Sequence, residues 1–202
     1  MPIGIESLGM TCDQQLTPKG AQLLDHWRNL PRREGERLPY WQDVSASALL
    51  PIMDRAWVLE HMPPDKMIVK YMGSRVVTFA GQDTTGQDFV RTRIAPENRP
   101  YMLALYRIVY DTPCGACLTR LLRRRGQNNK IMTTTFFPLH SSDEGNWMLL
   151  GMSEIETTSA IPDTAGQADF FSSHLREPYF VDLGYGTPSD LALAERLSPL
   201  RP

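Results

Sequence analysis

Two cysteines separated by two residues offer the most direct chemistry in the sequence. Cys114 and Cys117 have the spacing of a dithiol redox site, in which the first thiolate attacks and the second resolves the mixed disulfide. Such pairs open a helix that follows a strand, because the helix N-terminus stabilises the thiolate. Here a helix is expected before the pair and a strand after it, which favours ordinary strand cysteines. A dithiol oxidoreductase that uses Cys114 and Cys117 is kept as an alternative.

The histidines do not form a metal-binding pattern. They are scattered along the chain, at His26, His61, His140 and His174. None belongs to a His-x-x-x-His or Cys-x-x-Cys-His motif, which would hold zinc or attach haem covalently. No metal site is therefore predicted. Haem binding through a single axial histidine is left as an open possibility, and no cofactor is specified.

A glycine-rich segment from Gly81 to Gly86 has the glycine spacing of a phosphate-binding loop. Such a loop continues with Lys and then Ser or Thr, whereas Gln87 and Asp88 follow here. An aspartate at that place would repel phosphate, so nucleotide hydrolysis is not expected. The sequence also lacks a Gly-x-Ser-x-Gly nucleophile elbow. We predict no catalytic residue and a protein that is not an enzyme.

Positive charge gathers on one predicted hairpin, at Arg120, Arg123, Arg124, Arg125 and Lys130. Strand alternation places Arg124 on the opposite face from Arg123 and Arg125, and no aromatic residues interleave with them for base stacking. The net charge of the chain is -2, so no overall field attracts nucleic acid or anionic lipid. We expect a solvated hairpin edge and no nucleic-acid partner.

A set of aromatic and methionine residues is the remaining candidate for a binding site. Its members are Trp57, Tyr71, Phe89, Met102, Tyr106, Phe137 and Trp147. One interpretation is a cavity that these residues line between a sheet and the surrounding helices. The other is plain core packing, which the 10 methionines would make adaptable. Both interpretations stay open.

Helical periodicity defines the element that comes before the main domain. Apolar residues recur with helical spacing between positions 16 and 30, with Thr17 as the cap and Pro18 at the first helical position. Leu23, Leu24 and Trp27 form the apolar face of this helix, and we predict a homodimer through that face.

The main domain alternates between strand and helix patterns. A hairpin is expected over 57–72, with Met67, Val69 and Tyr71 on one face and Lys70 on the solvent side. Short helical turns and loops over 73–93 would give an opening into the core. A helix over 98–110 and three strands at 116–124, 130–139 and 147–155 complete an α+β domain at 45–156. Residues 1–44 form a helical extension, and 157–202 form a tail that folds back or awaits a partner.

Two short motifs, together with the order of strands and helices, carry a resemblance to a known family. The first is Gly73-Ser74 at the end of a strand, and the second is Gly81-x-Asp83-x-Thr85-Gly86. With the element order, they make residues 18–156 resemble the PAS domains, in particular a stand-alone bacterial branch without an output domain. The cysteine pair and the tail depart from the family pattern.

The resemblance implies a five-stranded antiparallel sheet cupped around a small cavity, with flanking helices. PAS domains serve ligand sensing, dimerisation or protein docking, and their fold does not fix the ligand. We therefore predict a non-catalytic sensory or regulatory domain that binds a small ligand or a signalling protein. A structural docking adaptor with a filled core is a further alternative.

The amino terminus lacks the basic start and apolar stretch of a secretory signal, and no run approaches the roughly 20 apolar residues of a spanning helix. The 3 cysteines do not suggest a disulfide framework. We expect a cytoplasmic protein without membrane insertion.

Overall fold

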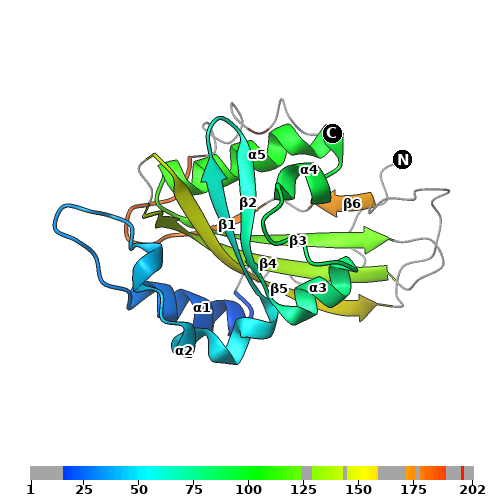
Figure 1. The fold of residues 1–202 in the computed structure, drawn as a ribbon, viewed down its shortest axis with the longest axis horizontal. Coiled ribbons are helices and arrows are strands. Elements are labelled where there is room, and N and C mark those ends of the chain that lie inside the picture. Colours follow the sequence, from blue (N-terminus) through cyan, green and yellow to red (C-terminus); the bar gives the residue numbers. More distant parts are fainter. Residues whose placement is uncertain are drawn as a thin grey trace.

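An antiparallel sheet separates two groups of helices in the computed structural model (Figure 1). The structure describes residues 16–123, 129–142, 145–158, 172–175, 178–189 and Leu197. The strand order is β2-β1-β5-β4-β3-β6, and β7 also pairs with β3. The predicted α+β class with an antiparallel sheet is confirmed.

The five central strands follow the order along the chain that the sequence predicts. They are β1 (Ala56–Met62), β2 (Lys66–Met72), β3 (Gly115–Arg123), β4 (Asn129–His140) and β5 (Trp147–Thr158). The β1–β2 hairpin turns at 63–65, and β1 pairs on its other side with β5. The longest ladder joins β4 to β5, from Asn129 opposite Thr158 to His140 opposite Trp147. Strand β4 is rich in Thr and Phe, which favour a pleated, half-buried surface.

A bulge in the hairpin changes which residues of β2 share a face. Val58 lies opposite Tyr71, but the next residue of β1, Leu59, lies opposite Val69, so one extra residue of β2 is accommodated between them. Met67 and Val69 are buried and Lys70 is exposed, as predicted. The prediction that Tyr71 shares the face of Met67 and Val69 is wrong, because the extra residue inverts the alternation beyond it.

One face of the sheet is covered by helices from the middle of the chain. These are α3 (Ser74–Ala80), α4 (Phe89–Arg93), the 3-10 turn η4 (Pro96–Asn98) and α5 (Arg99–Asp111). Helix α5 buries its apolar stripe, which includes Met102, Leu105 and Val109, against the sheet. The predicted helix before Pro113 and the short turns over 73–93 are both observed.

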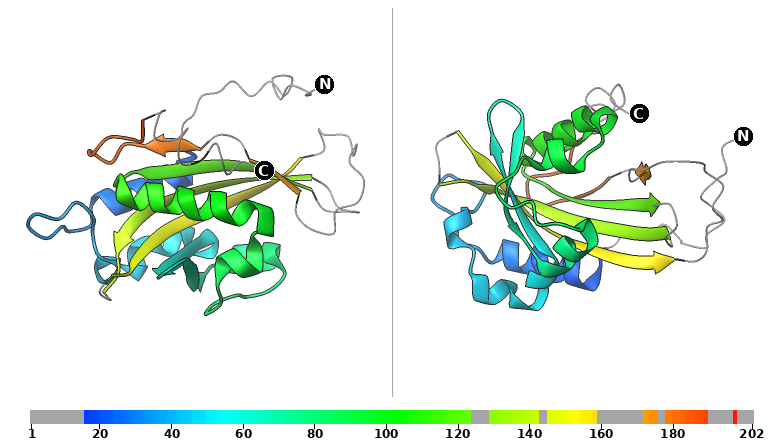
Figure 2. Two further views of the ribbon diagram at one scale, coloured as in Figure 1. Left: turned by 90° about the horizontal axis from the view of Figure 1, so that it is seen from above. Right: turned by 45° about the vertical axis from the view of Figure 1, so that its right-hand side comes forward.

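The opposite face is covered by helices from the N-terminal part of the described chain (Figures 1 and 2). These are α1 (Pro18–Arg28), η2 (Trp41–Asp43), α2 (Ala46–Leu49) and η3 (Leu50–Arg55). The Thr17 hydroxyl caps α1 by accepting from Gly20 N at 3.0 Å. The indole Nε1 of Trp27 donates to Pro138 O at 2.8 Å, which fixes α1 on β4.

This packing changes the role expected for the apolar face of α1. Leu23 and Trp27 are 0% exposed and Leu24 is buried, all within the core between α1 and the sheet. The predicted dimer contact through these three side chains therefore has no free surface. Their partner is the sheet of their own chain.

The described part of the tail extends the sheet beyond the five strands expected. Strands β6 (Ser172–Leu175) and β7 (Tyr179–Val181) pair antiparallel with successive parts of β3. The sheet therefore has seven strands. The added strands hydrogen-bond along the outer edge of β3, which would otherwise be open to strand addition.

No helix in the described ranges has both the length and the apolar character needed to cross a membrane.

Candidate functional site

A mainly apolar cavity of about 140 Å³ lies between the sheet and the helices α3, α4 and α5. Four of the seven residues proposed from the sequence line it, namely Trp57, Phe89, Met102 and Tyr106. They come from β1, α4 and α5, so the cavity is built by segments that are distant in the sequence. Residues of α3 and α4, in the segment expected to open into the core, form part of its lining.

The other three proposed residues lie elsewhere. Tyr71 and Phe137 belong to the core on the α1 side of the sheet, and Trp147 lines an open hollow at the end of the hairpin. Phe136, the neighbour of Phe137, faces the helices α3–α5 instead. Its ring lies 5.9 Å from the Trp57 ring and 5.5 Å from the Tyr106 ring. The sequence showed two adjacent phenylalanines without showing which one points to which face.

Polar side chains that the sequence analysis did not assign to the cavity also line it. They are Arg93, Asn98, Arg120, Thr134 and Ser153. Arg120 was interpreted as part of a solvated basic hairpin. The strand alternation indicated that Arg120 faces the core instead. Leu118 and Ala116, which lie two and four residues before Arg120, are apolar and share its face of β3. Both of those residues are buried in the core beside α5.

Hydroxyl groups form a small network at the floor of the cavity. The Trp57 Nε1 donates to Ser153 Oγ at 3.1 Å, and Ser153 Oγ lies 3.1 Å from Thr134 Oγ1. Burial raises the pKa of Tyr106 to about 12, with the neighbouring Arg120 guanidinium acting in the opposite direction. Tyr106 is therefore a neutral phenol at any physiological pH.

The two arginines give the cavity a positive charge, and no carboxylate is among the described residues that line it. Arg93 is fixed by backbone carbonyls, since Nη1 donates to Ala80 O at 3.1 Å and Nη2 to Gln82 O at 2.8 Å. Burial lowers the pKa of Arg93. Arg120 Nη2 donates to the thioether sulfur of Met102 at 3.1 Å, which is a weak acceptor.

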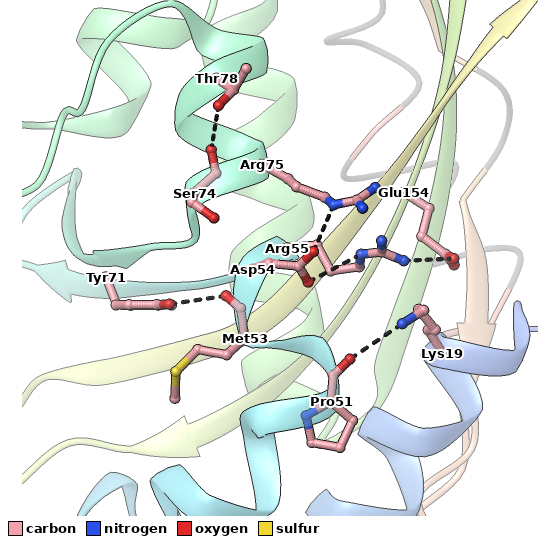
Figure 3. A network of polar contacts seen from close by, with 10 residues as sticks. All are labelled: Lys19, Pro51, Met53, Asp54, Arg55, Tyr71, Ser74, Arg75, Thr78 and Glu154. Carbon is pink, nitrogen blue, oxygen red and sulfur yellow. Dashed lines mark hydrogen bonds and ion pairs between the residues drawn. The ribbon is translucent and has the colours of Figure 1, made fainter.

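The first family motif positions α3, one wall of the cavity. A Cβ on Gly73 would overlap the backbone of Met53 and Asp54, so only glycine permits this approach to η3. Figure 3 shows contacts that Met53 and Asp54 make, where the Tyr71 hydroxyl donates to Met53 O at 2.9 Å and Arg75 pairs with Asp54 at 2.6 Å. Ser74 is the first residue of the helix, and its carbonyl accepts from Thr78 Oγ1.

The second family motif shapes the loop after α3. Gly81 ends the helix with a φ of 79°, and Gly86 has a φ of 82°, values that favour glycine. Between them Asp83 Oδ1 accepts from Thr85 N at 2.9 Å and from Thr85 Oγ1 at 2.7 Å. Gly86 N then donates to Val69 O at 2.8 Å, which joins the loop to β2. Both motifs therefore have structural roles at the cavity wall.

The two cysteines are not arranged as a reactive pair. Both are free thiols. Cys114 packs in the core beside α5. Cys117 lies opposite Thr135 in the sheet, and the Thr135 hydroxyl approaches Gly20 of α1, so Cys117 is on the α1 side. The thiols therefore point to opposite faces of the sheet. Burial raises the pKa of Cys114 to about 12 and also raises the pKa of Cys117. A raised thiol pKa opposes thiolate formation, so nothing in this site supports the oxidoreductase alternative.

An open hollow of about 710 Å³ lies at the end of the β1–β2 hairpin. The ring of Trp147 stacks between His61, with ring centres 4.6 Å apart, and Tyr110, at 5.0 Å. His140 lies at its border, with Nε2 2.9 Å from Glu36 Oε2. In the part of the chain that the structure describes, no group of three or more His, Cys, Asp or Glu residues could hold a metal ion.

Several residues of the earlier expectations have no described side chain. Arg124 and Arg125 lie outside the described residues, and the side chains of Arg123 and His174 are not described, although their strands are. Lys130 is half-buried, with its Nζ 5.1 Å from the centre of the Phe79 ring. The basic cluster is thus described only in part.

Comparison with protein-family models identifies the family of the chain. A family model described as a PAS domain matches residues 16–154, more than half of the 202 residues. The matched segment begins just before α1 and ends within β5, so it includes both the cavity and α1. No curated protein matches the sequence.

Proposed function

Since the chain belongs to the PAS domain family, whose members are generally non-catalytic sensory domains, we propose that it binds a small molecule in the cavity beside α3–α5. The observation that carries this proposal is the cavity itself. An apolar cavity of roughly 150 Å³ accepts a molecule as large as benzene. The cavity of about 140 Å³ is therefore suited to a compact ligand.

The construction of the cavity wall supports a sensory role. Helices α3 and α4 span only 7 and 5 residues, too short to be stable without their packing contacts. The ion pair of Arg75 with Asp54, which joins α3 to η3, lies at the exposed surface, where such pairs contribute little. A ligand that contacts Val76 and Phe79 of α3 would favour one position of this wall over others.

We propose further that a protein partner receives the signal. PAS domains commonly dimerise and bind partners or ligands, and a homodimer remains our prediction for this chain. Because the apolar face of α1 packs on its own sheet, the dimer contact has to use another surface. Sedimentation velocity at two protein concentrations tests the dimer, since a single species with the mass of one chain at both would contradict it.

Native mass spectrometry of the purified protein tests the ligand proposal. The Ala80→Phe variant places an aromatic side chain at the cavity wall, and Thr78→Phe adds the same side chain at an exposed position of the same helix. We expect an excess mass on the wild type and on Thr78→Phe that is absent from Ala80→Phe. The same excess mass on Ala80→Phe would place the ligand elsewhere, and bare chain mass in all three proteins would contradict tight ligand binding.

Protein docking is a second candidate function, and the open hollow at the hairpin favours it. Tyrosine and arginine are among the residues that dominate the energetics of protein interfaces, and the hollow presents Tyr110, Arg33 and Arg107 around the buried Trp147. An Arg107→Glu substitution there would weaken a docked partner without affecting the cavity. Partner binding that survives both Arg107→Glu and a neutral Arg107→Ala variant would exclude this surface.

A further inference from the structure

Three buried polar atoms without a hydrogen-bond partner surround one cavity. They are the Nε of Arg93, the Oδ1 of Asn98 and the Nε of Arg120. All three residues line the cavity beside α3–α5, although they come from α4, η4 and β3. Buried polar groups in folded proteins are nearly always paired, so a cluster of exceptions indicates a missing partner.

The chemistry of these atoms indicates which partner is missing. A guanidinium Nε–H is a donor on a permanent cation, and no carboxylate among the described residues pairs with Arg93 or Arg120. Arginine presents its donors in a planar fork that matches the two oxygens of a carboxylate. The two arginine donors therefore match an anion with planar acceptor geometry, whereas the Asn98 Oδ1 is itself an acceptor that such an anion does not pair with.

Arg120 is better placed than Arg93 to bind that anion. Both Nη atoms of Arg93 already donate to the carbonyls of Ala80 and Gln82. The Arg120 guanidinium bonds the weakly accepting sulfur of Met102 through Nη2 and also the neutral Tyr106 hydroxyl, and its Nε is unpaired. Exchanging a thioether for a carboxylate oxygen strengthens the hydrogen bond, whereas releasing Arg93 would break two good ones.

Resting on the proposed function, we infer that the cavity binds a small carboxylate with a compact apolar body, whose carboxylate accepts hydrogen bonds from Arg120. The apolar body, about the size of a benzene ring, contacts Trp57, Phe89 and Met102. Arg93, on α4, adds positive potential without direct pairing. Thr134 and Ser153 already hydrogen-bond each other at the floor, so the charge is recognised at the Arg120 side.

Benzoate and benzamide form a matched pair of probes, since they share the ring and differ in charge. Affinities are measured by ligand-observed saturation-transfer NMR on the wild type, on Arg120→Met and on Arg91→Met. Arg91 is an exposed arginine on α4, so its variant controls for the loss of one positive charge. Methionine keeps an unbranched apolar side chain about as long as the stem of Arg120, without the guanidinium donors.

We expect benzoate to bind the wild type and Arg91→Met about tenfold or more tightly than benzamide, and Arg120→Met to abolish that preference. Benzamide binding as tightly as benzoate, or benzoate binding unchanged in Arg120→Met, would overturn the anion inference while leaving the cavity as a ligand site. Binding of neither probe would overturn the inference as well, and the mass-spectrometry test of Ala80→Phe decides the proposed function separately. The wild-type comparison needs no variant to fold, and circular dichroism checks that Arg120→Met is folded.

Discussion

Truncation of Leu23 on α1 tests whether this helix is part of the domain core. Leu23 is 0% exposed and packs between α1 and the sheet. Replacing such a leucine with alanine costs about 2–5 kcal/mol, depending on how far the surroundings collapse into the space. The helix is held on both sides of Leu23, by the close approach of Gly20 to Thr135 and by the hydrogen bond from Trp27 to Pro138. Collapse is therefore restricted.

For Leu23→Ala we expect a loss in the free energy of unfolding of about 3–4 kcal/mol, in the upper part of that range. For a chain of this length, a loss of 3 kcal/mol lowers the midpoint of thermal unfolding by about 6–12 °C. Urea unfolding followed by circular dichroism measures the free energy, and differential scanning calorimetry measures the midpoint. The exposed Gln22 on the same helix gives the control, since Gln22→Ala should change stability by less than about 0.5 kcal/mol.

The unfolding midpoint of Leu23→Ala should shift equally at low and high protein concentration, because the lost contacts lie within one chain. Destabilisation no larger than that of Gln22→Ala, together with a change in oligomeric mass, would refute the reasoning. That result would return α1 to the role of a dimer helix.

Three further predictions concern a buried carboxylate, the thiols and a tight packing contact. Glu60 is 4% exposed, and burial alone would raise its pKa. The hydroxyl of Ser141 and the ammonium of Lys70, which bond its carboxylate, hold the pKa below its usual 4.5. The stability that Glu60 contributes is therefore present above pH 4.5 and is lost as the pH falls through the lower pKa of the folded protein. The advantage of wild type over Glu60→Gln in urea unfolding should therefore shrink in acid, and a pH-independent difference would contradict it. In a variant whose third cysteine is replaced by serine, Cys114 and Cys117 should react with a thiol reagent only after unfolding, because burial raises the pKa of both thiols. Rapid reaction of the native protein would contradict this prediction, since it would show an accessible thiol. Gly151→Ala places a methyl group against the indole of Trp57 and should cost about 1–3 kcal/mol and shift tryptophan emission, whereas unchanged stability would show that the ring moves freely.

The sequence alone predicts the elements whose signals are local. The cap at Thr17, the apolar period of the helix before Pro113 and the turn at 63–65 are each encoded within a few residues, and the structure has an element at each place. The family resemblance also rests on short local motifs, and the family match over 16–154 confirms it. Three of the four cavity residues named from the sequence, Trp57, Met102 and Tyr106, lie on elements with a clear period, whereas Phe89 lies in the segment of short turns expected to open into the core.

The errors concern the faces that strands present. Tyr71 changes face because of a bulge, which is a property of the β1–β2 pairing and not of β2 alone. Phe136 and Phe137 are equivalent in type, and only the register of β4 on its neighbours decides which one meets Trp57. Arg120 was assigned to solvent although the alternation of β3 places it on the same face as the buried Ala116 and Leu118.

Contacts between segments that are distant along the chain could not be predicted from the sequence either. An amphipathic helix requires a cover for its apolar face, but its period does not say whether the cover is a second copy or its own sheet. In this protein α1 meets Pro138, 111 residues away, and the tail strands meet β3. Local patterns thus determined which residues are helical, extended or buried. The tertiary structure decided which buried groups face one another, because register and long-range packing depend on the whole chain and place Arg120 and two other unpaired polar groups around one cavity.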